Sequence, residues 1–363
     1  MNFIIDGHED LAFEALANQR DTTRSVAEIR EKEPQNTENQ VTLGWPEMQA
    51  GKVGIIFATI FIEPPAHQTP PKRTGVNYGT PDEFHQSVRK QLDFYEQWED
   101  SCPDKFTIIR SLSDLDQTIS RWQREVENPT GSTLPVGLVL LLEGAEGLRK
   151  EDDLDEYYDR GLRIVGPVWE GGRWCGGTYS PDSMRFTPEG KRFLEILASK
   201  GFILDVAHMN TFSADEALDL YEGTVIASHC NCRRLLKSPE NQRHFDDETI
   251  RKLIDRDGVM GVIPFNNFLD TGWKNGMPRN RVTLDLLAQH IDHICQLAGN
   301  ADHAAIGSDL DGGFGYPNIP EEMNDIQDLQ KLEQILQQKG YTPEDIMKIF
   351  NGNWISVLKR GLP

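Results

Sequence analysis

The nine residues from Pro135 to Glu143 read Pro-Val-Gly-Leu-Val-Leu-Leu-Leu-Glu, a short apolar run closed by a carboxylate. Polar residues do not alternate with apolar ones in this run, as they do in a strand with one face in water. A strand of this composition is buried on both faces, which is the position of a parallel strand between layers of helix. The run therefore predicts a parallel α/β fold.

Eight short apolar runs of this kind occur along the chain, with amphipathic helical patterns between them. They occupy residues 3–6, 53–62, 135–142, 163–168, 202–207, 224–228, 259–264 and 304–308. Eight strands that alternate with helices predict a closed (β/α)8 barrel of the TIM type. An open doubly wound sheet is the structural alternative. No glycine-rich dinucleotide or P-loop fingerprint follows an early strand, which weighs against the nucleotide-binding versions of that sheet.

The segments between the runs carry helix-start signals. Thr187-Pro-Glu and Thr342-Pro-Glu-Asp each place a proline in the first helical turn. Ser213-Ala-Asp-Glu has the capping-box pattern. Helical spacing of apolar residues is found at 191–200, 217–221, 246–257, 282–297 and 329–339.

One long insertion, at about residues 63–130, separates the second run from the third. It contains a proline-rich segment at 64–71 and helical stretches near 81–99 and 112–127. We interpret it as an elaboration of the barrel, so residues 1–363 are predicted to form a single domain, because barrels of this length often fold as one unit.

The composition limits the partners of this protein. The chain has 363 residues and a formal net charge of −21. This charge disfavours nucleic acid and anionic membranes, which both bind basic patches. The five cysteines lack zinc-finger spacing and are expected to be free thiols in a reducing compartment. The first residues contain no signal-like segment, and no apolar run approaches the roughly 18 residues of a membrane span, so we expect a cytoplasmic protein.

Polar residues of the kinds that bind metals follow several of the apolar runs. They are His8, Asp10, Glu143, His208, His229 and Asp309. In a (β/α)8 barrel the carboxyl ends of all strands meet on one face, where active sites are built. These residues are far apart in the sequence, and the predicted fold brings them together.

The pattern His8-Glu-Asp10 predicts two side chains that reach the same ion, because alternate residues of a strand share a face. Imidazole nitrogen and carboxylate oxygen suit zinc and related divalent ions. Two ions about 3.5–4 Å apart need an anionic bridge, and the carboxylate of Glu143 can supply it. Each residue alone also has an ordinary explanation, since histidines at strand ends are more often hydrogen-bonded than ligating, and Asp6 and Asp311 precede glycines as turn residues do. Six other histidines are assigned to this ordinary class: His67, His85, His244, His290, His293 and His303.

Several stretches together resemble the renal (membrane) dipeptidase family, a zinc peptidase branch of the amidohydrolase-like barrels. They are Asp6-Gly-His8-Glu-Asp10-Leu, Gly51-Lys-Val-Gly54, Glu143-Gly, Leu204-Asp-Val-Ala-His208, Ser228-His229, Ile306-Gly-Ser-Asp309-Leu-Asp-Gly312 and Gly352-Asn353-Trp354. The matches follow the order of the family and span nearly the whole chain.

The resemblance implies a role for each residue. His8, Asp10 and Glu143 would hold one zinc ion, and Glu143, His208 and His229 a second, with Glu143 as the bridge. A hydroxide shared by the ions would attack the scissile carbonyl, and Asp309 would carry its proton toward the leaving amine. The other divalent metals Mn, Co and Fe also suit these ligands. The resemblance further suggests a homodimer.

Substrate binding is implied less directly. An arginine of the family binds the terminal carboxylate of the substrate, and Arg243 matches it best, with Asn231, Arg233 and Arg234 as competitors nearer His229. Trp169 occupies the place of a family histidine that binds a substrate oxygen. Its indole N–H can still donate a hydrogen bond but cannot carry a positive charge. Arg173, in the same glycine-rich stretch, is a candidate for the missing donor.

These observations favour a dipeptidase that uses two metal ions. Hydrolysis of N-acyl amino acids, cyclic amides or lactones by the same centre is the alternative, and Trp169 is its main support. A barrel that binds metal without turnover is a third reading, disfavoured by the complete set of ligands.

Overall fold

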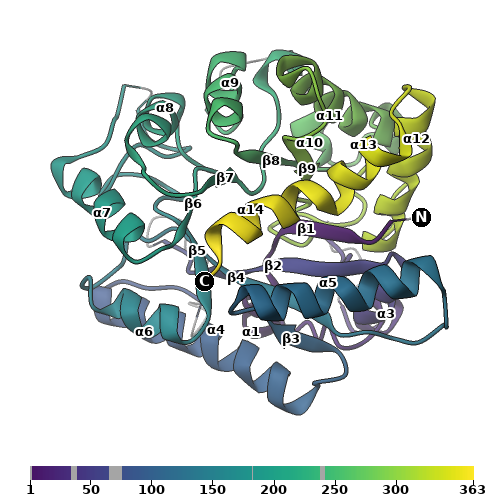
Figure 1. Ribbon diagram of the computed structural model, residues 1–363, viewed down its shortest axis with the longest axis horizontal. Coiled ribbons are helices and arrows are strands. Elements are labelled where there is room, and N and C mark those ends of the chain that lie inside the picture. The colour runs from purple at the N-terminus through teal and green to yellow at the C-terminus, as the bar shows by residue number, and fades with distance from the viewer. Residues whose placement is uncertain (1, 34–38, 65–75, 182, 238–241) are drawn as a thin grey trace.

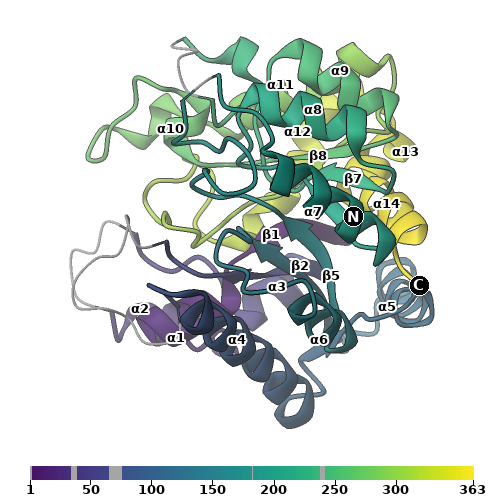
Figure 2. The same cartoon turned by 90° about the vertical axis from the view of Figure 1, so that its left-hand side faces the viewer.

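The computed structural model describes residues 2–33, 39–64, 76–181, 183–237 and 242–363. Its centre is a sheet of parallel strands surrounded by helices (Figure 1 and Figure 2). The strands are β1 (Ile4–Glu9), β2 (Val53–Phe61), β3 (Phe106–Ile108), β4 (Val136–Glu143), β5 (Leu162–Gly166), β6 (Ile203–Asp205), β7 (Val225–Ala227), β8 (Val259–Val262) and β9 (Ala304–Ile306).

Eight of these strands close into a barrel in the order β1, β2, β4, β5, β6, β7, β8 and β9, and β9 pairs back with β1. The pairing of β2 with β4 completes the ring and runs from Ile55 opposite Gly137 to Phe61 opposite Glu143. Each of the eight predicted runs overlaps one of these strands. The TIM-type barrel is therefore confirmed, and the open sheet is excluded.

The ninth strand, β3, was not predicted from the sequence. Its three residues pair with the start of β4, from Phe106 opposite Val136 to Ile108 opposite Leu138, whereas β5 pairs with the end of β4 from Leu140 onward. A three-residue strand gives too short an apolar run to be told from a loop. It lies in the insertion, between the two long helices predicted there, α4 (Pro81–Ser101) and α5 (Leu112–Glu127). The proline-rich segment of the insertion lies almost wholly outside the described residues.

The other helices surround the barrel. They are α1 (Leu11–Asn18), α2 (Val26–Arg30), α3 (Trp45–Ala50), α6 (Asp153–Asp159), α7 (Pro188–Ser199), α8 (Thr211–Leu220), α9 (Asp247–Asp255), α10 (Asn266–Leu269), α11 (Leu284–Ala298), α12 (Leu332–Gln338), α13 (Pro343–Met347) and α14 (Asn353–Gly361). Thr187 and Thr342 cap α7 and α13 as predicted. Helix α8 begins two residues before Ser213, because Asn210 accepts the cap hydrogen bond from the Ser213 backbone.

Three glycines allow the strands to crowd around the carbonyl oxygen of Ser228, which follows β7. A Cβ atom added at Gly7 would lie 2.6 Å from this oxygen, and one at Gly261 or Gly307 would overlap it. Only glycine fits at such a close approach of backbone to backbone. These glycines belong to β1, β8 and the end of β9, so the packing sets the position of Ser228 inside the barrel.

The C-terminal motif Gly352-Asn353-Trp354 ties the last helix to the barrel. Asn353 donates to the carbonyls of Ala301 and Ala304, and the indole of fully buried Trp354 donates to that of Ile306 at 2.8 Å. Helix α14 therefore crosses the barrel next to β9 (yellow in Figure 1). The motif serves the fold by satisfying backbone groups at the start and end of β9.

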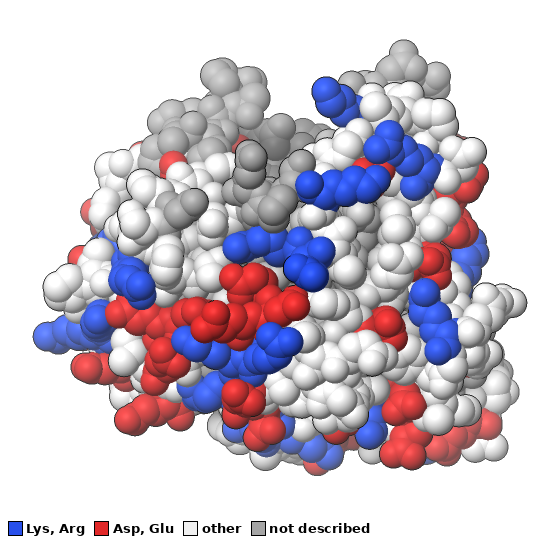
Figure 3. All heavy atoms as spheres, turned by 90° about the horizontal axis from the view of Figure 1, so that it is seen from above, with Lys and Arg blue, Asp and Glu red and all other residues white. Residues whose placement is uncertain are grey.

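The face seen in Figure 3 carries acidic and basic side chains side by side. Within the described part of the chain, no helix has the length and apolar character needed to cross a membrane. The expectation of a single domain stays a prediction.

Candidate metal centre

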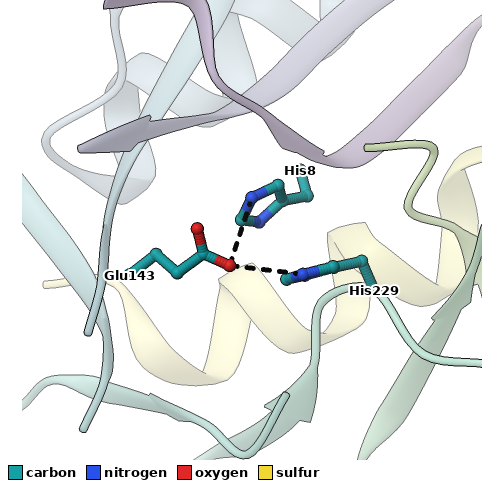
Figure 4. Close-up of side chains that lie close together, drawn as sticks. All are labelled: His8, Glu143 and His229. Atoms are coloured by element: carbon teal, nitrogen blue, oxygen red, sulfur yellow. Dashed lines mark ion pairs between the residues drawn. The ribbon is translucent and has the colours of Figure 1, made fainter. Parts of the chain in front are cut away.

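Three histidines converge on one carboxylate oxygen at the carboxyl ends of the strands. The Oε1 atom of Glu143 lies 2.9 Å from Nε2 of His208, 3.3 Å from Nε2 of His229 and 3.6 Å from Nε2 of His8. Figure 4 shows His8, Glu143 and His229 pointing toward one another from β1, the end of β4 and the residue after Ser228. All four side chains are buried or nearly so. The structure therefore brings together the four residues predicted to share this centre.

Asp10 and Asp309 complete the cluster on the other side of His8. The Nε2 atom of His8 lies 4.0 Å from Oδ1 of Asp10 and 3.9 Å from Oδ1 of Asp309. Asp10 stands at the N-cap position of α1, yet its side chain makes no capping hydrogen bond. It is therefore available as a ligand in the cluster. Asp309 adopts a left-handed backbone with φ of 55°, and its N–H donates to the carbonyl of His8. This turn aims the carboxyl group at the cluster.

Two overlapping groups of side chains in the described residues have the geometry of a metal site. One consists of His8, Glu143 and His229, and the other of His8, Asp10 and Asp309, with ligand atoms within 4.8 Å of one another in each. The position of Glu143 Oε1 among three imidazoles agrees with the bridging role inferred from the resemblance. Asp309, predicted to move a proton, also lies close enough to Asp10 to touch the same ion.

The three histidines of the cluster are held neutral. Burial lowers the pKa of His8 to about 3, with the charge of Arg243 as the second cause. Burial likewise lowers the pKa of His208 and His229 well below the usual range. A neutral imidazole offers a lone pair, which is the form that binds a metal ion. Both ring nitrogens of His8 are without a hydrogen bond to any described residue.

Burial shifts the pKa values of the carboxyl groups in the opposite direction, upward. Burial raises the pKa of Asp10, Glu143 and Asp309 well above the usual range, and the charge of Asp309 raises that of Glu143 further. Buried carboxylates that face each other require a compensating positive charge. Divalent cations supply it, and the nitrogen and oxygen donors are those that zinc and related ions prefer. The residues therefore fit the metal ions expected from the sequence.

His229 is oriented by Ser228 and Asp205, which lie in the quoted stretches but were given no role there. The hydroxyl of Ser228 donates to Oδ2 of Asp205 at 2.5 Å and lies 2.7 Å from Nδ1 of His229. Because its only proton goes to Asp205, the serine accepts the Nδ1–H of His229, and the lone pair of Nε2 points at Glu143. The sequence signal for this support was Asp205, a carboxylate at the end of the apolar strand β6. The serine was visible only as the residue before His229.

Trp169 lies beside the cluster, and Arg173 does not. The ring of Trp169 is 5.9 Å from that of His208. The guanidinium of Arg173 forms an ion pair with Glu189 at 3.0 Å, donates to the carbonyls of Glu146 and Leu148, and stacks on Trp174. These bonds hold Arg173 against α7, so the structure does not bring it to the metal centre.

Arg243 is buried close to the metal centre. Its side chain is 3% exposed, and its charge lowers the pKa of Glu143 and Asp309. The competing residues have other roles or positions. The side chain of Asn231 bonds to the backbone of Ile263, Arg233 donates to the His244 carbonyl, and Arg234 is exposed.

The histidines predicted not to bind metal have other partners. His85 bonds to Tyr157, and the Nδ1 atom of His290 accepts from the backbone of Cys232. His293 pairs with Asp247, His303 bonds to the carbonyl of Gly258, and the backbone of Asn231 donates to His244. His67 lies outside the described residues. Asp311, interpreted as a turn residue, has a φ of 65° and accepts three hydrogen bonds from Thr42 and Leu43.

Comparisons with known proteins show the family to which the chain is similar. A family model described as membrane dipeptidase (peptidase family M19) matches residues 2–361. A Klebsiella pneumoniae protein described as an uncharacterized protein in the pqqA 5′ region is 30% identical over 232 residues, which cover 62% of this chain and 82% of that protein. The dipeptidase aclJ of Aspergillus oryzae is 21% identical over 365 residues, covering 98% of this chain and 77% of aclJ. A metallo peptidase from Rhodobacter sphaeroides, solved with a phosphinate mimic of the dipeptide L-Ala-D-Ala, has a TM-score of 0.77 at 20% identity and covers 99% of both chains.

Proposed function

This chain belongs to the membrane dipeptidase family of metallopeptidases, and from that membership we propose that it hydrolyses dipeptides at a centre of two zinc ions. The observation that carries the proposal is the position of Glu143 Oε1, within 3.6 Å of three imidazole nitrogens. A single oxygen so placed is suited to bridge two cations.

The proposed ligands divide between the two ions. His8, Asp10 and Glu143 would hold one ion, and Glu143, His208 and His229 would hold the other. A divalent ion in such a site supplies Lewis acidity for a carbonyl oxygen and lowers the pKa of a water molecule. The raised pKa of Asp309 and the distance of 3.9 Å between its Oδ1 and Nε2 of His8 support a role for this carboxyl group as a proton carrier.

The protein side chains would position the substrate and move its protons. Asp309 would take a proton from the attacking water and deliver it to the leaving amine. Arg243, buried close to the centre, would bind the terminal carboxylate through its guanidinium fork. Trp169 would border the substrate on the side of His208. Arg173 is bound elsewhere and is not part of this proposal.

A second candidate is hydrolysis of N-acyl amino acids, cyclic amides or lactones at the same centre. Trp169 favours it, because a neutral indole replaces the histidine that the family resemblance leads one to expect. Loss of one transition-state donor typically costs roughly 10²–10³ in rate, and a lactone, whose ester bond is more reactive than an amide, would depend less on that donor than a dipeptide.

The test is a substrate panel with the zinc-loaded protein. L,L- and L,D-dipeptides are assayed beside N-acetyl amino acids, cyclic dipeptides and lactones, and kcat/KM is compared. Cleavage of dipeptides above the other classes supports the first proposal. Cleavage of only the other classes favours the second, and no cleavage by a fully metal-loaded protein would mean binding without turnover.

Cytoplasmic location and a homodimer remain predictions. The reducing compartment also remains a prediction; four of the five free cysteines are buried and Cys102 is partly exposed.

A further inference from the structure

The loop that follows β5 is anchored beside the metal centre by a buried carboxylate. The Oε1 atom of Glu146 accepts the backbone N–H groups of Trp169, Glu170 and Gly171 at 2.9, 3.1 and 3.1 Å. Glu146 follows the ligand Glu143 by only three residues. The same carboxyl end of β4 therefore supplies a metal ligand and fixes the position of the Trp169 backbone.

Gly144 lets this loop approach the strand. Its φ is 77°, and a Cβ atom there would lie 3.2 Å from the Cβ of Trp169. A side chain at this position would be strained by the backbone and would crowd the tryptophan. The Trp169 backbone is thus held by the Glu146 carboxylate and lies close to Gly144, so the position of the indole does not depend on its own packing alone.

Trp169 belongs to a row of four aromatic rings that borders the metal centre. Phe13, Phe61, Trp169 and Tyr179 follow one another with 5.3 Å between successive ring centres. Three of the four rings are close to residues of the cluster in the sequence, in the sheet register or in space. Phe13 follows Asp10 by three residues, Phe61 is the register partner of Glu143, and the Trp169 ring lies 5.9 Å from that of His208.

The exposure of the rings differs along the row. Phe61 is the most buried at 9% exposed, Phe13 and Trp169 are half-buried, and Tyr179 at the end of the row is 60% exposed. A row of aromatic rings that reaches from the ligands of a centre to solvent offers an apolar contact surface for a molecule at that centre.

We propose that this aromatic row, Phe13, Phe61, Trp169 and Tyr179, binds the side chain of the substrate's N-terminal residue and selects large apolar side chains, aromatic ones above all. This inference rests on the proposed dipeptidase function. It identifies the class of dipeptide that the centre cleaves best.

The position of the row in the barrel decides which end of the dipeptide it contacts. Phe61 is the last residue of β2 and Trp169 follows β5, whereas Arg243 lies in the segment between β7 and β8. In the order β1, β2, β4, β5, β6, β7, β8 and β9, strand β7 stands opposite β2. A dipeptide whose carboxylate reaches Arg243 therefore extends its N-terminal residue across the metal centre toward Phe61 and the rings next to it.

The test compares L-Phe-L-Ala, L-Ala-L-Phe and L-Ala-L-Ala as substrates of the metal-loaded full chain. We expect kcat/KM for L-Phe-L-Ala to exceed that for L-Ala-L-Ala by about tenfold or more, the scale of burying one large apolar side chain. L-Ala-L-Phe should not show this gain. In Tyr179→Ala and Phe61→Leu, the advantage of L-Phe-L-Ala should shrink, mainly through a higher KM.

Phe212→Ala is the matched control, because Phe212 is a 41% exposed aromatic residue on α8 outside the row. It should keep the full preference, and thermal melting should show that each variant is folded. Equal kcat/KM for L-Phe-L-Ala and L-Ala-L-Ala, with both cleaved, would overturn the inference and leave the dipeptidase function standing. Failure to cleave any of the three, and likewise L-Phe-D-Ala, L-Ala-D-Phe and L-Ala-D-Ala, would overturn the dipeptidase function and this inference with it.

Discussion

The Nε2 atoms of His208 and His229 lie 2.9 Å apart, and both face Oε1 of Glu143. Ligand atoms about 2.0–2.1 Å from one tetrahedral zinc ion are separated by roughly 3.3 Å. The three atoms are thus near the spacing of ligands on a single ion. They come from the ends of three strands that are far apart in the sequence, so only the closed barrel brings them together.

Metal analysis should find close to two ions per chain, because the cluster holds three carboxyl groups and three neutral imidazoles. Removal of the metal with a chelator should abolish hydrolysis and lower the melting temperature, since bound ions stabilise the folded state by mass action. Elemental analysis and calorimetry before and after zinc is restored check both effects. His208→Ala should lose about one ion per chain. Retention of two ions by that variant would contradict the proposed division of ligands.

His8→Ala should reduce kcat/KM by about 100-fold or more, a larger loss than the 10–100-fold typical of groups that only support a ligand. His8 lies in both candidate groups of ligands, so its loss disturbs the whole centre. His303→Ala is the control, because His303 bonds to the Gly258 carbonyl at the opposite end of β9. Full activity of His8→Ala would remove the metal centre from the reaction.

Ser228→Ala should weaken metal binding by about 10- to 100-fold without removing a ligand. The variant leaves the Nδ1–H of His229 without its acceptor, so the ring is no longer held with its Nε2 lone pair toward Glu143. Metal affinity measured by competition with a chelating dye tests this directly. Ser87→Ala is the matched control, since Ser87 is a buried serine on α4 that donates to the Asn77 carbonyl. Equal losses in both variants would indicate a general effect on folding.

The barrel could be predicted because the sequence signals for its strands and helices are local and recur along the chain. Each strand is an apolar run such as 135–142, and helices such as α7 and α13 have their own caps, so eight independent runs agree on one architecture. Strand β3 could not be predicted, because three residues carry no recognisable period. The start of α8 was misplaced for a related reason. Asn210 and Ser213 are both good capping residues, and only the tertiary hydrogen bonds of Ser213 to Gly176 and Met184 decide between them.

The metal cluster could be predicted because its members all end apolar runs and the barrel has one face where such ends meet. What supports the cluster could not be predicted in the same way. Asp205 and Glu146 act through hydrogen bonds to residues 23 or more positions away, which no spacing in the sequence reveals. The position of Arg173 also depends on a partner elsewhere, Glu189 on α7.

Glu146→Ala should loosen the Trp169 loop and reduce kcat/KM for L-Phe-L-Ala by roughly 10- to 100-fold, the scale of a misplaced binding group. The fall should be smaller for L-Ala-L-Ala, which makes less contact with the aromatic row. Glu125→Ala is the matched control, because Glu125 also accepts backbone N–H groups of a loop, those of Thr130 and Gly131, on an exposed surface. An equal loss on both substrates would mean that Glu146 supports Glu143 rather than selectivity.

Gly307→Ala should destabilise the barrel by about 1–3 kcal/mol or more and impair the metal centre at the same time. The added Cβ would overlap the carbonyl oxygen of Ser228 and lie 2.9 Å from its carbonyl carbon. Both are backbone atoms, so no side chain can turn aside to relieve the overlap. Because Ser228 orients His229, the backbone shift should reach the ligands.

Thermal melting and metal affinity of Gly307→Ala should therefore both fall. Gly352→Ala provides the control, since Gly352 has helical dihedral angles and its nearest neighbour would be 3.7 Å from the new Cβ. That variant should melt at the same temperature or slightly higher, because alanine loses less backbone entropy than glycine on folding. A Gly307→Ala protein with unchanged metal affinity would show that the crowding around Ser228 serves the fold alone.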